Sequence, residues 1–161
     1  MEKTRKSQGF PRPLPSYKID VFNLQRTLSL SESSVKSVVS FLLKTYRVAS
    51  RQLAIYFVSR QRIQALHGQF FGSGTATDCI TCPFDPPEQK GFLGEIFVCP
   101  EVASIFARKN QLDPYEELTL YLIHGFLHLM GFKDKTSLER KQMRAEEKKC
   151  LQLLGSSILR K

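Results

Sequence analysis

Long apolar runs are missing from this sequence of 161 residues, because histidine or charged residues interrupt each apolar stretch. A helix that spans a membrane needs about 20 consecutive apolar residues, so no membrane partner is expected. Residues 1–15 also lack the apolar centre of a secretory signal peptide. These two absences predict a cytoplasmic protein.

Cysteines are few, and they are not arranged in two pairs. The four are Cys79, Cys82, Cys99 and Cys150, and in a cytoplasmic protein they are expected to be free thiols. Cys79 and Cys82 form a C-x-x-C pair, but a zinc knuckle needs a second pair. They fall in an expected strand, where residues three apart point to opposite faces. We therefore interpret both as small buried apolar residues.

Charge is unevenly distributed along the chain. The net charge is +9, although basic and acidic groups nearly balance between residues 13 and 132. Residues 1–12 carry four basic groups and one acid, and residues 133–161 carry nine basic and four acidic groups. A basic excess of this kind indicates a polyanionic partner such as nucleic acid. A solvated helix face that only promotes solubility explains the same distribution.

The composition is otherwise that of a globular protein, with 42% hydrophobic and 24% charged residues. Residues 1–16 are basic and rich in proline, which predicts a flexible arm. Residues 17–161 are enough for a single domain with its own core.

Hydrophobic periodicity predicts an alternation of strands and helices. Strands are expected at residues 17–23, 53–58, 77–83 and 93–99, and helices at residues 31–46, 60–68, 101–108, 114–130 and 136–155. The first strand, helix and second strand predict a right-handed parallel crossover. The sequence therefore predicts an α+β domain in which a four-stranded mixed sheet packs against about five helices.

The last of these helices is strongly charged. Thr136 and Glu139 have the spacing of a capping box, and Gly155 suits its end. Its apolar contacts are expected from four leucines: Leu138, Leu151, Leu153 and Leu154.

The helix at residues 114–130 is the expected centre of the domain. Asp113 suits its N-cap and Pro114 its first position. Gly131 suits the stop that follows it. Residues 118–130 are apolar on almost every face, whereas a surface helix shows a single apolar stripe. This pattern predicts a buried helix.

Two histidines lie within this apolar helix. His124 and His128 are four residues apart, so their side chains share one face and can reach one metal ion. A turn at Gly131 would bring Asp134 to the same place as a third ligand. Two histidines and one carboxylate leave coordination positions open, as in catalytic metal sites. The alternative is that both histidines are hydrogen-bonded core residues, since buried polar groups need partners.

The stretch H-G-F-L-H-L-M-G-F at residues 124–132 resembles the signature of the YbeY family of bacterial endoribonucleases. T-D-C-I-T-C-P-F at residues 77–84 and L-G-E-I-F-V-C at residues 93–99 are similar to two strands of that family. The resemblance covers roughly residues 52–154. It implies a small mixed sheet with helices, a zinc-type metal held by the three motif ligands, and an RNA substrate. It also implies maturation of ribosomal RNA, especially at the 3′ end of the small-subunit RNA, and ribosome quality control.

Three positions depart from the family's motifs. Asp134 stands where the family has histidine, and Lys133 stands where it has aspartate. Phe71, in L-H-G-Q-F-F at residues 66–71, aligns with a basic residue that the family is expected to use for a phosphate. A carboxylate is an acceptable metal ligand, so the first change is compatible with metal binding. The third removes a cation, which Arg60, Arg62 or Lys133 are candidates to replace.

Two alternatives concern the ligands. H-x-x-x-H-x-x-G also resembles the helix of a metzincin peptidase, but such enzymes place their general base directly after the first histidine. That position is Gly125 here, which argues against a peptidase. His67 is a second candidate for the third ligand, after Asp134.

The sequence therefore predicts a metal-dependent, single-strand-directed endoribonuclease with ribosomal RNA, the ribosome or its assembly factors as partners, and no DNA. Its metal, expected to be zinc, would be held by His124, His128 and Asp134 and would lower the pKa of a bound water. The alternative is a non-catalytic, metal-binding ribosome-assembly or RNA-binding factor.

Overall fold

A computed structural model describes residues 15–155 and 159–160 of the chain. These residues form four strands: β1 (Lys18–Asn23), β2 (Gln52–Phe57), β3 (Cys79–Pro83) and β4 (Phe92–Val98). They also form five helices: α1 (Glu32–Thr45), α2 (Arg60–Phe71), α3 (Pro100–Asn110), α4 (Pro114–Leu129) and α5 (Ser137–Leu154). The predicted α+β fold is confirmed. Of the arm predicted at residues 1–16, residues 1–14 lie outside the described residues.

The strands form one mixed sheet in the order β1-β2-β4-β3. β1 and β4 both run parallel to β2, while β3 is antiparallel to β4. β1 and β2, which are joined through α1, pair in parallel as predicted. β1 and β3 are therefore the two edges of the sheet.

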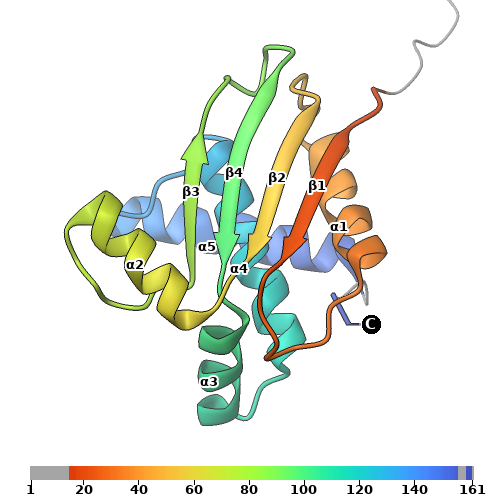
Figure 1. Cartoon of the computed structure of the whole chain (residues 1–161). Helices are drawn as coiled ribbons and strands as arrows, with labels where there is room; N and C mark the ends of the chain where they lie inside the picture. Colours follow the sequence, from red (N-terminus) through yellow and green to blue (C-terminus); the bar gives the residue numbers. More distant parts are fainter. Residues whose placement is uncertain (1–14, 156–158, 161) are drawn as a thin grey trace, which may run out of the picture.

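Helices cover the two faces of the sheet unequally. Figure 1 shows α1, α4 and α5 behind the sheet and α2 in front of it. The larger apolar core lies on the side of α1, α4 and α5, and a smaller cluster lies under α2. Cys79 contacts the first core and Cys82 the second, so this C-x-x-C pair does divide between opposite faces.

The buried position of α4 follows from its composition. Asp113 caps it by accepting a hydrogen bond from the Tyr115 amide at 2.7 Å, and Pro114 is its first residue. Gly125 faces the sheet, where a Cβ atom would come within 2.7 Å of Ile96 Cγ2. The missing side chain therefore allows the helix to pack tightly on β4 and β3.

Two details of the predicted helices are wrong. α2 does not end at Gly68 but continues to Phe71, because Gly72, at φ 71°, supplies the left-handed residue that closes it. On α5, Leu138 and Leu153 are exposed, and Met143 and Cys150 are buried beside Leu154. The buried residues repeat at helical spacing, which leaves both exposed leucines on other faces of the helix. The predicted Thr136–Glu139 capping box is confirmed.

Across the part of the chain that the structure describes, no helix is both long enough and apolar enough to cross a membrane.

Candidate metal centre

Three side chains converge at the C-terminal end of α4. Both histidines come from the helix, and Asp134 comes from the loop that joins α4 to α5. His124 Nε2 lies 3.0 Å from His128 Nε2. Asp134 Oδ2 lies 3.3 Å from the first nitrogen and 3.4 Å from the second. The structure thus brings together the three residues that the sequence singled out as metal ligands.

The turn after α4 orients His128. Gly131 adopts φ 94°, and the chain folds back so that the Phe132 carbonyl lies 3.0 Å from His128 Nδ1. A carbonyl oxygen only accepts, so Nδ1 carries the proton and donates it. In the neutral ring, Nε2 is then the nitrogen with the free lone pair, on the side of the other two ligand atoms.

Glu147 of α5 orients His124 in the same way. Its Oε1 accepts from His124 Nδ1 at 2.6 Å, which directs Nε2 towards His128 and Asp134. Burial lowers the pKa of His124, but the hydrogen bond to Glu147 and the nearby acids outweigh it and raise this pKa. A carboxylate behind a ligand histidine is a common partner in metal sites.

The spacing and chemistry of the three atoms fit a metal ion. Ligands held at about 2.0–2.1 Å around a tetrahedral ion lie about 3.3 Å apart, close to the separations of 3.0, 3.3 and 3.4 Å found here. The Nδ1 hydrogens of His124 and His128 are donated to Glu147 and to the Phe132 carbonyl. In neutral rings, the lone pairs of both Nε2 atoms therefore face a lone pair of Asp134 Oδ2. Such an arrangement is repulsive unless a cation or a proton lies between them.

Two other groups lie near the ligands. Asp78, Cys79 and His124 also have potential ligand atoms within 4.8 Å of one another. Burial raises the pKa of the Cys79 thiol well above its ordinary value, so this residue is a poor ligand in its neutral form. His67 donates from Nδ1 to the Ser73 carbonyl at 2.6 Å, and it is not part of either group among the described residues.

Two cavities meet at the ligands. One, of ≈ 340 Å³, opens towards α2 and β3 and is lined by His67 and Phe71 together with His124, His128 and Asp134. We call this side the α2 wall. The other, of ≈ 390 Å³, opens towards α5, and its lining includes Glu147, Arg140 and Arg144. We call this side the α5 wall.

The cations proposed from the sequence lie elsewhere. Arg60 and Arg62 are exposed at the start of α2 and line neither of these two cavities. Lys133 is exposed and lines a separate hollow with Glu139. It therefore points away from the ligands, although it precedes Asp134 in the chain.

Sequence reasoning missed Glu147, Arg140 and Arg144. A signal for Glu147 was present, because it interrupts the buried stripe of Met143, Cys150 and Leu154 at helical spacing. The two arginines had no comparable signal, since each is one of several basic residues on a charged helix.

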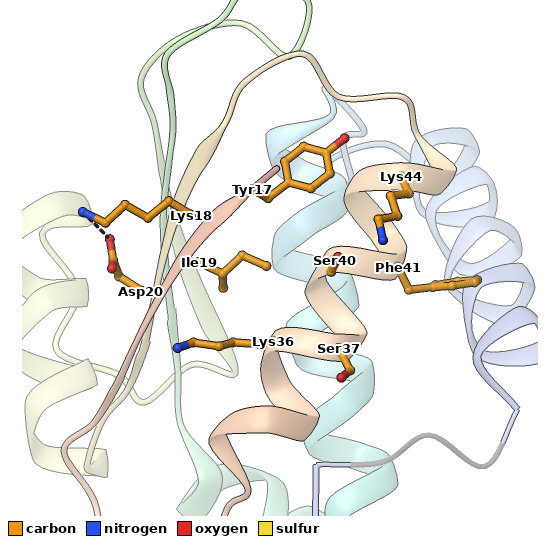
Figure 2. Close-up of a pocket in the computed structure, with 9 residues that line it drawn as sticks. All are labelled: Tyr17, Lys18, Ile19, Asp20, Lys36, Ser37, Ser40, Phe41 and Lys44. Carbon is orange, nitrogen blue, oxygen red and sulfur yellow. Dashed lines mark ion pairs between the residues drawn. The ribbon is translucent and has the colours of Figure 1, made fainter. Parts of the chain in front are cut away.

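A cavity larger than these two lies away from the proposed ligands. It measures ≈ 720 Å³ and lies between the edge strand β1 and α1. Figure 2 shows Lys36 and Ile19 in this space and Lys18 paired with Asp20 on the same side of β1. It contains none of the potential metal ligands, so its size does not make it the reactive site.

The fold and this site define a small α+β protein with a His₂-carboxylate group able to hold one metal ion. The family model for endoribonuclease YbeY matches residues 20–155, and the chain belongs to this family.

Curated relatives agree with this assignment. Endoribonuclease YbeY of Protochlamydia amoebophila is 42% identical over 118 residues, which are 72% of this chain and 79% of that protein. The protein of the same name from Chlamydia pneumoniae is 36% identical over 143 residues, 85% of this chain and 90% of that protein.

A solved structure supports the fold. The solution structure of TM1509 from Thermotoga maritima matches with a TM-score of 0.55 and 23% identity, over 84% of this chain and 90% of that one.

Proposed function

We propose that this chain is a metal-dependent endoribonuclease whose metal is held by His124, His128 and Asp134. The observation that carries the proposal is the convergence of their three potential ligand atoms within 3.4 Å of one another. The names of the relatives supply the reaction class, hydrolysis within an RNA chain. They do not favour the non-catalytic alternative.

Each residue has a role that its contacts support. His124 and His128 present Nε2 because Glu147 and the Phe132 carbonyl occupy the other ring nitrogens. Asp134 adds a negative oxygen, which strengthens attraction for a divalent ion. The metal would supply Lewis-acid chemistry, lowering the pKa of a water ligand and offsetting charge that develops on the attacked phosphate.

Zinc is the metal that we propose. Two imidazoles and one carboxylate form a donor set that zinc accepts in catalytic sites, with a position left open. The carboxylate of Asp134, at the family's histidine position, makes the set harder and should shift preference towards oxygen-loving ions relative to three histidines.

Ribosomal RNA is the proposed substrate, with the ribosome or its assembly factors as partners, in line with the family that the motifs resemble. The net charge of +9 supports a polyanionic substrate. The cytoplasmic location expected from the sequence stays a prediction.

Elemental analysis combined with RNA cleavage tests this function. We would compare the purified protein with His128→Ala, Asp134→Ala and the control His67→Ala, which removes the third histidine beside the site. Near-stoichiometric metal and cleavage are expected in wild type and in the control, and loss of both in the two ligand variants.

Metal retained in Asp134→Ala but lost in His67→Ala would assign the third ligand to His67 instead. Cleavage that survives His128→Ala would reveal a contaminating nuclease.

A further inference from the structure

The α2 wall offers a phosphate no cation. Phe71 is 63% exposed there, and its ring centroid lies 5.0 Å from that of His67. The family resemblance expects a basic side chain at this position. Among the residues that line this cavity, no lysine or arginine is present. An RNA phosphate brought to the metal ligands from this side would meet an aromatic surface.

The α5 wall carries two arginines. Arg140 and Arg144 are one helical turn apart, so they share a face of α5, and both line the cavity that contains His124 and Asp134. Arg144 is exposed and has no hydrogen-bond or ion-pair partner within residues 15–155 and 159–160. Its guanidinium is therefore available to a ligand.

Arg140 has a different set of contacts. It donates to the Lys135 carbonyl at 2.7 Å, the Asp134 carbonyl at 3.4 Å and Ser137 Oγ at 3.3 Å. These bonds hold the loop that carries the third potential ligand. Arg140 is thus a positioning residue for the Asp134 loop as well as a source of positive charge.

The acidic side chains of the α5 wall affect how a phosphate is attracted to this cavity. The cavity also contains Asp78, Glu117, Asp134 and Glu147. With two arginines against four acids, the metal-free cavity is negative and repels phosphate. A divalent ion would balance this negative charge. Arg144, which has no partner among the described residues, would then attract the phosphate.

We propose that Arg144 binds a phosphodiester of the RNA substrate, so that the cation missing from the α2 wall is replaced from the α5 wall. This inference rests on the proposed nuclease function. A guanidinium donates two parallel hydrogen bonds to phosphate oxygens, which both orients the backbone and stabilises added negative charge.

Steady-state cleavage of a single-stranded RNA tests the proposal. Arg144→Ala is compared with Lys141→Ala, which removes an exposed cation from the same helix outside both cavities. Loss of one charged hydrogen-bond partner should lower kcat/KM by about 10- to 100-fold in Arg144→Ala and by less than about 2-fold in the control. Arg144→Lys should recover part of the loss, since it restores charge without the paired donors.

Two further measurements separate this role from a structural one. Metal content and thermal unfolding of Arg144→Ala should match wild type, because the side chain is exposed and contacts no ligand atom. The slope of log affinity against log salt, measured on RNA with the zinc-loaded protein, should fall by about 1.

The possible failures are distinguishable. If wild type cleaves RNA and Arg144→Ala behaves like Lys141→Ala, the phosphate role is wrong and the nuclease function stands. If Arg144→Ala loses its metal, the arginine acts on the site's structure and not on substrate. If zinc-loaded wild type does not cleave RNA, the proposed function itself fails; an unchanged salt slope would then also exclude Arg144 as a phosphate contact.

Discussion

Helices α4 and α5 pack against each other and both reach the candidate metal centre, but they do so in different environments. α4 has ten buried residues among its sixteen, whereas α5 has three among eighteen. His124 and His128, the proposed metal ligands, lie on the buried helix. The groups around them lie on the exposed helix: Glu147 orients His124, Arg140 holds the Asp134 loop, and Arg144 lines the adjoining cavity.

This contrast divides the expected effects of mutation. A side chain on α4 is held by neighbours on almost every side, so a change there should act through the stability of the fold. Most side chains on α5 contact solvent, so a change there should act through binding and leave folding nearly intact. The predictions below test that division, beginning with the largest expected loss of stability.

Phe126→Ala on α4 should lower the free energy of unfolding by about 3–5 kcal/mol. Phe126 is 1% exposed, and its ring makes an edge-to-face contact with Tyr46 at a centroid distance of 5.5 Å. Truncation leaves a cavity between α4 and α1 that the surrounding residues cannot close completely. Urea unfolding followed by circular dichroism measures the loss, and a change below about 1 kcal/mol would contradict close packing at this position.

The same contrast explains what could be predicted from the sequence. The burial of α4 was readable because its apolar residues surround the helix, and the pairing of its histidines followed from a spacing of four. To predict that Asp134 approaches the two histidines, it was enough to expect a short turn at Gly131. These features are local, so they do not depend on how distant segments pack.

The sequence pattern did not predict which face of α5 packs against the domain. Leu138 and Leu153 are as apolar as Leu154, and only tertiary packing decides that the first two face solvent. Arg144 lines the same cavity as His124 and Asp134 because α5 packs against α4 there, which no spacing within either helix reveals. The length of α2 was missed because Gly68 and Gly72 both suit a helix end, and the chain uses the second.

Gly125→Ala should lower the free energy of unfolding by about 2 kcal/mol. A Cβ there comes within 2.7 Å of Ile96 Cγ2 and 3.4 Å of Thr81 Cγ2. Ile96 is fully buried and β-branched, so it cannot turn aside, and α4 must move from the sheet. The gain in helix propensity, about 1 kcal/mol, offsets only part of this effect.

Metal content gives Gly125→Ala a second measurement. A shift of α4 moves both histidines relative to Glu147, so zinc affinity should fall about 10-fold or more. Wild-type stability together with wild-type metal content would show that β4 yields more readily than its burial indicates.

Tyr46→Phe should lower stability by about 1 kcal/mol near neutral pH. The Tyr46 hydroxyl, at the end of α1, donates to Glu146 of α5 and also lies 3.3 Å from Cys150 Sγ. The hydrogen bond from Tyr46 lowers the pKa of Glu146. A lowered acid pKa stabilises the fold above the ordinary value of the carboxyl group, and this stabilisation is lost as the pH falls through the lowered value.

The difference between Tyr46→Phe and wild type should therefore narrow on acidification from about pH 6 to about pH 3. Urea unfolding at each pH measures it, with Lys149→Ala as the control that removes the other partner of Glu146. A difference that stays constant with pH would indicate that Cys150, and not Glu146, is the partner that matters.

Leu138→Ala on α5 should change the free energy of unfolding by less than about 0.5 kcal/mol, the smallest effect in this series. Leu138 is 65% exposed, so truncating it removes little apolar surface from a protein environment and leaves no enclosed cavity. Alanine is also the better helix former, which offsets the small loss.

Leu153→Ala, at 53% exposure on the same helix, should have a similarly small effect on the free energy of unfolding. Phe126→Ala, measured under identical urea conditions, supplies the contrast with a buried apolar side chain. A loss above about 1 kcal/mol at Leu138 would mean that α5 is anchored along its whole length, and the division between a structural α4 and a binding α5 would have to be abandoned.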